Sequence, residues 1–267
     1  MKIDKITHVD LEQIRDLQPD GWKDISRVFR FYVNNFFCNP VKVTIKNKII
    51  GLGNSIIFSN TAWIAHIIVK KEYRNKGIGF QIVNYLIKTV EEKSIESVLL
   101  IATELGEPVY KKAGFRIISD YIRLDREHLW IKNPVAKNIV PYTNNFYSEI
   151  INFDKMISGE DREPLIRLYL KNGLIYLDKN KLRGFYLPDL GEGPVFADNA
   201  EAGRELMKVK YSKTDNAVIP AENIAGIDFL KQNGFKITGI KGKRMILGKD
   251  ILWKPGCFYS RIGGNYG

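Results

Sequence analysis

The sequence contains an internal repeat, and this repeat restricts the fold more than any other feature. Residues 103–115 align without gaps on residues 223–235, and both segments have glycine at their fourth position and end in Gly-Phe. An apolar run of strand length precedes each segment, and the helical pattern of residues 201–209 falls at the same offset on a helix predicted around residues 82–90. Since a unit repeated within one chain folds similarly each time, the sequence predicts two copies of one mixed α/β unit.

Length and composition agree with two domains. The 267 residues can form one large domain or two of about 130 residues each, and either can bury a core. Between residues 133 and 145, prolines and asparagines replace the apolar repeats, which is typical of a linker. We therefore predict an N-terminal domain over residues 1–133, a linker over 134–147 and a C-terminal domain over 148–267.

The first domain has a pattern of helices, then strands, then a β-α-β-α-β order. Apolar spacing predicts one or two helices between residues 11 and 32, interrupted near Pro19-Asp20-Gly21. Strands are predicted over residues 41–45, 49–52, 55–58, 63–69 and 98–102, with a short helix over residues 107–113. Residues 115–124 are predicted to close the domain as a hairpin.

A basic loop containing two glycines joins a predicted strand and helix in the first copy. The loop carries Arg74, Lys76, Gly77 and Gly79. Glycines let the backbone approach a ligand closely, amides at the helix N-terminus point at an anion, and nearby cations add charge. The spacing matches neither the dinucleotide fingerprint nor the phosphate loop that ends in Gly-Lys-Ser/Thr. It predicts a phosphate-binding loop, and an ordinary strand-to-helix turn is the alternative.

Composition argues against a membrane protein, a disulfide framework and a metal site. No apolar run approaches the ~20 residues of a membrane span, and the N-terminus lacks the hydrophobic core of a signal peptide. The two cysteines, Cys38 and Cys257, and the three histidines do not have metal-ligand spacing. We therefore expect a cytoplasmic protein with reduced thiols and no bound metal.

The net charge of +11 favours anionic partners, which include nucleic acid and phosphorylated cofactors. The lysines are spread along the chain, and no recognised nucleic-acid module appears. Nucleic acid is therefore not the expected partner. A basic nucleic-acid-binding protein remains the weakest alternative, and it predicts affinity that falls steeply with salt.

Two motifs of the first copy resemble the GNAT superfamily of N-acyltransferases. The spacing Arg74-x-x-Gly77-x-Gly79 resembles its pyrophosphate loop, R/Q-x-x-G-x-G/A, and Tyr110-x-x-x-Gly114-Phe115 resembles its closing strand–helix element. The chain is also similar to a bacterial subgroup with two tandem GNAT units, of which the second is degenerate. This resemblance implies a mixed α+β fold of two units, each a mostly antiparallel sheet flanked by helices.

The resemblance also implies that acetyl-CoA binds the first unit as co-substrate. In the family, the fourth and fifth strands splay apart, and backbone groups at the end of the fourth strand bind the pantetheine arm and orient the thioester. By position, these groups belong to Ile67, Ile68 and Val69. The amides that bind the pyrophosphate then come from the loop, namely Arg74, Asn75, Lys76, Gly77, Ile78 and Gly79.

Tyr110 matches the family's general acid, which protonates the leaving CoA thiolate. A phenol with an ordinary pKa near 10 is neutral at pH 7 and can donate that proton. The general base stays open between His66, Glu104 and a route through water or an unprotonated amine. Thr103 stands where the family often has a cofactor-contacting asparagine, and its hydroxyl can instead cap the following helix.

The second copy lacks these groups. At the repeat's offset, Arg74, Gly77 and Gly79 fall on Pro194, Ala197 and Asn199, and Tyr110 falls on Leu230. Catalysis is therefore expected in the first half alone. The resemblance implies an acetyl-CoA-dependent N-acetyltransferase acting on a primary amine, which is a small molecule or, alternatively, a protein lysine. A non-catalytic CoA- or protein-binding module on the same scaffold is the second hypothesis.

Overall fold

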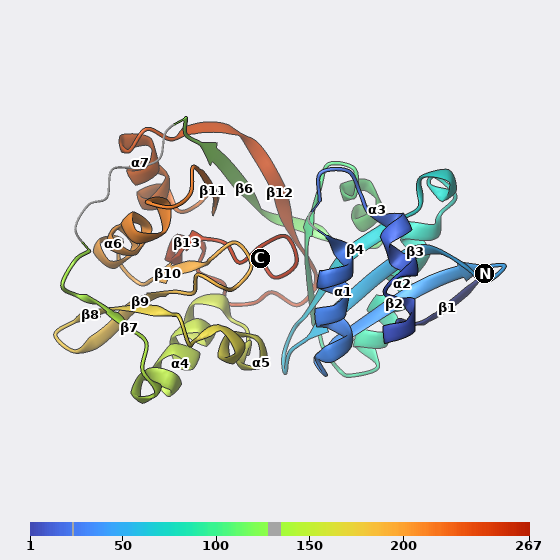
Figure 1. Cartoon of the computed structure of the whole chain (residues 1–267), viewed down its shortest axis with the longest axis horizontal. Helices are drawn as coiled ribbons and strands as arrows, with labels where there is room; N and C mark the ends of the chain where they lie inside the picture. The colour runs from blue at the N-terminus through green and yellow to red at the C-terminus, as the bar shows by residue number, and fades with distance from the viewer. Residues whose placement is uncertain (23, 128–134) are drawn as a thin grey trace. The chain divides into compact units, whose positions relative to one another are not determined.

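The computed structural model describes residues 1–22, 24–127 and 135–267 (Figure 1). Two units divide the chain. The first contains Met1–Arg116, Met245–Lys249 and Tyr266, and the second contains Ile117–Arg244, Asp250–Asn265 and Gly267. The predicted domains over residues 1–133 and 148–267 stay a prediction. Residues 133 and 134, where the predicted domain ends and the predicted linker begins, lie outside the described residues.

The first unit is built on a mostly antiparallel sheet. Strands β1 (Lys2–Lys5), β2 (Cys38–Ile45), β3 (Lys48–Ile57), β4 (Ala62–Val69) and β5 (Ser97–Ala102) lie in that order. The first four pair antiparallel, and β5 runs parallel to β4. The C-terminal end of β12 (Lys236–Gly248) follows β5. The buried Met245 lies in the same core as β5, so a distant segment of the sequence completes this unit.

Helices of the first unit follow the predicted apolar spacing only in part. Residues 8–17 form the short 3₁₀ helices η1 (His8–Asp10) and η2 (Gln13–Leu17), and α1 (Ile25–Asn34) begins where the Asp24 carboxylate accepts a bond from the Ser26 amide. The other helices are η3 (Lys71–Tyr73), α2 (Ile78–Glu91) and α3 (Glu107–Lys112).

Helix α2 packs closely on the sheet through its apolar face. A Cβ at Gly53 would lie 2.5 Å from a methyl carbon of Ile82, so β3 needs glycine there. The buried side chains of α2 are Ile78 and the five predicted from helical spacing, namely Ile82, Val83, Leu86, Ile87 and Val90.

The predicted hairpin over residues 115–124 is wrong. These residues form one continuous strand, β6 (Arg116–Asp125), which pairs antiparallel with β11 (Asn216–Pro220) in the second unit. Local alternation does not reveal this, because the partner of each strand is set by residues far along the chain.

The second unit has two groups of strands. In one, β6 lies between β12 and β11. In the other, the order is β13 (Phe258–Ser260), β10 (Val195–Ala197), β9 (Lys181–Tyr186), β8 (Leu174–Asp178) and β7 (Ile139–Pro141). Its helical segments are η4 (Asn144–Phe146), α4 (Tyr147–Ser158), α5 (Glu163–Ile166), η5 (Arg167–Tyr169), α6 (Ala200–Tyr211), α7 (Ile224–Gln232) and η6 (Pro255–Cys257).

The two units share one order of elements, as the internal repeat predicts. The first contains β4-α2-β5-α3, and the second contains β10-α6-β11-α7. The mixed α/β class with sheets flanked by helices is confirmed. In the part of the chain that the structure describes, no helix has both the length and the apolar composition needed to cross a membrane.

Candidate active site

Strand β4 contains a β-bulge in the segment that the sequence assigns to the thioester. Leu52 of β3 pairs with Ile68, and Asn54 pairs with Ala65. Gly53 of β3 therefore lies opposite two residues of β4, His66 and Ile67, and this two-to-one arrangement is a β-bulge. His66 has a φ of 53°, in the left-handed region that residues other than glycine seldom adopt.

Strands β4 and β5 separate soon after they meet. Their parallel pairing consists of Ala62 with Val98 and Trp63 with Leu99. Beyond Trp63, β4 continues to Val69 while β5 ends at Ala102. The backbone of the bulge therefore lies past the paired segment, in the opening between the fourth and fifth strands that the sequence resemblance implies.

The N-terminus of α2 is exposed and has no side-chain cap. Gly77 precedes the helix with a φ of 77°, and the first helical hydrogen bond runs from the Gln81 amide to the Gly77 carbonyl. The first-turn amides of Ile78, Gly79 and Phe80 have no possible partner within the helix. A Cβ at Gly77 would meet nothing closer than Gln81 Nε2 at 4.0 Å, so the space beside Gly77 is open.

Cations surround this helix end. Arg74, Asn75 and Lys76 are exposed in the loop, and the nitrogen of Lys76 lies 5.3 Å from the ring centre of Tyr73. Together with the amides and the helix dipole, these charges make a suitable site for a multiply charged anion.

One cation near this helix end was missed by the sequence analysis. The nitrogen of Lys112 on α3 lies 4.8 Å from the ring centre of Phe80, in the first turn of α2. The sequence gives no signal for this contact, because it depends on how α3 packs. Arg74, which the sequence predicts to bind the pyrophosphate, also has a partner within the protein: its Nε donates to the carbonyl of Val69 at 3.0 Å.

Tyr110 lies on α3 with its ring against the core of the first unit, edge-on to Phe115 at 6.1 Å between ring centres. A Cβ at Gly106 would lie 2.9 Å from this ring, so glycine makes room for it. Burial raises the pKa of Tyr110 above its usual 10, which keeps the phenol protonated at neutral pH.

Thr103 and Glu104 lie in the turn between β5 and α3, and both are exposed. The Thr103 hydroxyl oxygen accepts a bond from the Gly106 amide at 3.3 Å in the turn before α3, and α3 itself has no side-chain cap. Glu104 follows the end of β5. Among the described residues, its carboxylate has no hydrogen bond or ion pair that would assign it a role as a base.

His66 is held by aromatic side chains of the N-terminal segment. Its Nδ1 lies 2.8 Å from the hydroxyl oxygen of Tyr32 on α1, and the rings of Trp22, Phe29 and Tyr32 approach it edge-on. Burial lowers the pKa of His66 from 6.5 to about 4, so the imidazole is neutral at pH 7. The sequence predicted Tyr32 only as a helix residue, since nothing local links it to β4.

The corresponding helix end in the second unit is already occupied. The side chain of Asn199 caps α6 by accepting from the Ala202 amide at 2.9 Å, and Asp198 precedes it. A capped amide and a neighbouring carboxylate disfavour an anion at this end.

The gap between β10 and β11 in the second unit is also filled. Strand β13 pairs with β10, and the Arg261 amide at its end donates to the Val218 carbonyl of β11 at 3.2 Å. Tyr259 packs so closely on α6 that a Cβ at Gly203 would lie 2.3 Å from its ring. The second unit therefore has no opening equivalent to that between β4 and β5 within the described residues.

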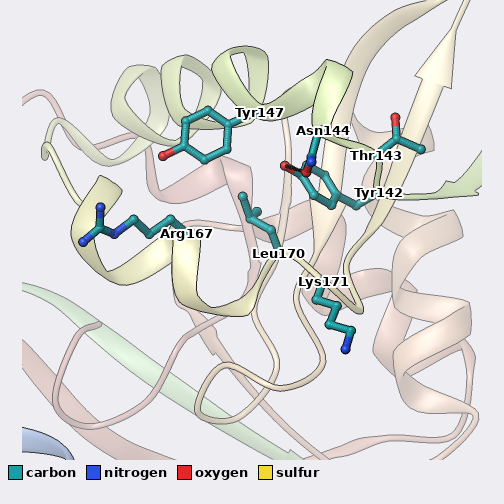
Figure 2. A pocket seen from close by; sticks show the side chains of 7 residues that line it. All are labelled: Tyr142, Thr143, Asn144, Tyr147, Arg167, Leu170 and Lys171. Carbon is teal, nitrogen blue, oxygen red and sulfur yellow. Dashed lines mark hydrogen bonds between the residues drawn. The ribbon is translucent and has the colours of Figure 1, made fainter. Parts of the chain in front are cut away.

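The second unit carries a separate open pocket of about 470 Å³ (Figure 2). Its Tyr147 hydroxyl donates to Glu163 at 2.6 Å, and the Tyr142 hydroxyl donates to Asn144 at 3.2 Å. None of the residues predicted from the two motifs lies in this pocket, which is lined by Tyr142, Thr143, Asn144, Tyr147, Arg167, Leu170 and Lys171. Among the described residues, no three His, Cys, Asp or Glu side chains gather as metal ligands.

Comparison with known proteins agrees with this geometry. Residues 5–115 match the Acetyltransferase (GNAT) family. The uncharacterized N-acetyltransferase YitH of Bacillus subtilis (strain 168) is 23% identical over 214 residues, which cover 72% of this chain and 72% of that protein. The match to the GNAT family model thus falls within the first unit, and the similarity to YitH extends beyond it.

Solved structures share the fold over both units. The crystal structure of a putative acetyltransferase from Pyrococcus horikoshii has a TM-score of 0.83 at 22% identity, and the match covers 100% of this chain and 95% of that one. A GCN5-related N-acetyltransferase from Anabaena variabilis has a TM-score of 0.60 at 13% identity, covering 92% of this chain and 72% of that one. At these identities the likeness concerns the fold alone.

Proposed function

We propose that the protein is an N-acetyltransferase that transfers the acetyl group of acetyl-CoA to a primary amine, with its site in the first unit. The observation that carries this proposal is the uncapped N-terminus of α2, which lies after β4 on the chain and offers open space over Gly77. The first-turn amides and the basic loop fit a pyrophosphate. The match of residues 5–115 to the GNAT family supports acyl transfer as the reaction class.

In this proposal, the pyrophosphate binds the amides between Asn75 and Gly79, with Arg74, Lys76 and Lys112 supplying charge. The pantetheine arm then extends along the unpaired edge of β4 beyond Trp63. Backbone groups of Ile67 and Ile68 orient the thioester. Val69 contributes less than the sequence suggests, because its carbonyl already accepts a bond from Arg74.

The amine nitrogen attacks the thioester carbonyl carbon, and the tetrahedral intermediate collapses with cleavage of the carbon–sulfur bond. The thiolate leaves with a proton from the phenol of Tyr110. The phenol is neutral at pH 7 and therefore holds the proton that this step needs, while burial raises its pKa and makes it a weaker acid before charge develops on sulfur.

The proton of the attacking amine leaves through water or through Glu104, which is exposed at the end of β5. His66 suits this role less well, because its Nδ1 is engaged by Tyr32. The acceptor is a small-molecule amine, and a protein lysine is the alternative. A cytoplasmic location stays a prediction from the sequence.

A non-catalytic CoA-binding module is the second candidate. The observation behind it is that β4 carries neither aspartate nor glutamate, so this strand supplies no carboxylate base. Such a protein would bind acetyl-CoA without releasing CoA in the presence of any amine.

The test is the release of CoA from acetyl-CoA with a panel of amines that includes a lysine peptide. Tyr110→Phe is expected to lower kcat by about 10²–10⁴-fold, the usual contribution of a general acid, while the Kd for acetyl-CoA stays nearly unchanged. Tyr85→Phe is the matched control, because Tyr85 is exposed on α2. Equal turnover in Tyr110→Phe and Tyr85→Phe would contradict the assignment of the acid.

A further inference from the structure

The bulge of β4 has a backbone conformation that needs an external restraint. His66 adopts a positive φ of 53° although it has a Cβ. A bulge leaves its extra residue outside the regular ladder, so the hydrogen bonds of the sheet alone do not hold this residue in place. The restraint must come from side-chain contacts.

Helix α1 supplies such a restraint. Tyr32, only 1% exposed, places its hydroxyl oxygen 2.8 Å from Nδ1 of His66. The ring of Phe29, also on α1, lies 6.0 Å from the imidazole and nearly perpendicular to it. The position of the imidazole is therefore fixed from α1 by one hydrogen bond and by ring packing.

The neighbouring bulge residue, Ile67, packs toward the start of α2. Its side chain packs against the core cluster that contains Ile78 and Ile82 of α2, and a Cβ built on Gly79 would lie 4.0 Å from it. His66 thus contacts α1 while Ile67 contacts the start of α2. The two residues connect the bulge to both helices, and a shift at His66 moves the backbone of Ile67 and Ile68.

We propose that Tyr32 and His66 are positioning residues that hold the β4 bulge, so that the backbone of Ile67 and Ile68 meets the thioester in the productive geometry. This inference rests on the proposed function. Neither residue donates or accepts a proton during the reaction. Misplacement of reacting groups by about 1 Å can cost about 100-fold in rate, so loss of the pair affects turnover more than cofactor affinity.

Three variants test the pair against a role of His66 as general base. Tyr32→Phe removes the hydroxyl and retains the ring. His66→Leu removes the nitrogen that pairs with Tyr32 and offers no side-chain hydrogen bond in its place, while the backbone stays at a positive φ. His66→Asn presents an acceptor where Nδ1 lies and tolerates the left-handed backbone. Tyr85→Phe is the control for the loss of a hydroxyl.

Kinetics give the first measurement. Tyr32→Phe and His66→Leu are expected to lower kcat by about 10–100-fold, with the KM for acetyl-CoA within about twofold of wild type. His66→Asn is expected to recover most of that loss and to keep the pH profile of kcat. If His66→Asn is as slow as His66→Leu and its pH profile loses the acidic limb, His66 is a base and the inference is overturned.

Hydrogen–deuterium exchange gives a second measurement that does not need turnover. Exchange of amides in residues 65–69 is expected to become faster in Tyr32→Phe and His66→Leu and to stay near wild type in His66→Asn. Unchanged exchange in Tyr32→Phe overturns the inference. If the wild-type protein releases no CoA with any amine, the proposed function fails, and the exchange data alone decide whether the pair holds the bulge.

Discussion

The surroundings of His66 change the proton affinity of its imidazole. Burial among aromatic rings lowers its pKa to about 4 from the usual 6.5. Between these pH values the unfolded chain binds a proton that the folded chain does not bind. The free energy of unfolding must therefore decrease as the pH falls through this range.

We expect this effect to reach at most about 3 kcal/mol when the pH falls from 6.5 to about 4. His66→Asn, which has no titrating group there, should lose that part of the pH dependence. Urea unfolding of both proteins at several pH values measures it. The same pH dependence in wild type and His66→Asn would mean that other groups cause it.

The first-turn amides are free of a side-chain cap in α2 and are capped in α6, and this difference favours anion binding at α2. Gly77 leaves the end of α2 uncapped, whereas Asn199 caps α6 with its own side chain. A carboxylate placed at the α2 end would occupy the amides and repel a pyrophosphate. A substitution in this loop is therefore expected to weaken acetyl-CoA binding while the protein still folds.

Gly77→Glu is expected to weaken acetyl-CoA binding by more than about 100-fold, equivalent to about 3 kcal/mol. Calorimetric titration measures the Kd, and wild type should bind one molecule per chain. Gly234→Glu is the matched control, because Gly234 has a similar φ of 83° in the second unit. Both variants should lose about 1–2 kcal/mol of stability from backbone strain. Normal affinity in Gly77→Glu would contradict the site.

The whole chain is organised so that the first unit needs the end of β12. Met245 is fully buried in the core of the first unit. The Ser97 hydroxyl donates to the Lys249 carbonyl at 2.9 Å, and the Lys249 amide donates to the Glu96 carbonyl at the same distance. The sequence places these residues at the other end of the chain, far from the domain they complete.

A fragment of residues 1–127 is therefore expected not to fold stably on its own. It would expose the edge of β5 and lack the buried side chains from 245 to 247, and losing one large core side chain costs about 2–5 kcal/mol. Circular dichroism and proton NMR of the fragment measure this. A well-dispersed spectrum with acetyl-CoA affinity equal to the full chain would refute it.

Much of the fold and site can be predicted from the sequence because the relevant patterns are local. Helical spacing gives the buried face of α2, and the repeat gives the shared order of elements in both units. The loop from Arg74 to Gly79 can be recognised because glycine positions and charge lie within a few residues of one another. Tyr110 follows from its spacing to Gly114 and Phe115.

The tertiary structure alone decides how distant segments meet. The bulge at His66 and its bond to Tyr32, the contact of Lys112 with α2, and the entry of Met245 into the first core have no local pattern. The same holds for β13, which fills the second unit. Periodicity records which face of an element is buried, but not which partner covers it. The sequence by itself thus determined the repeated order of elements and the local spacing of the predicted anion loop, and long-range packing determined the geometry around them.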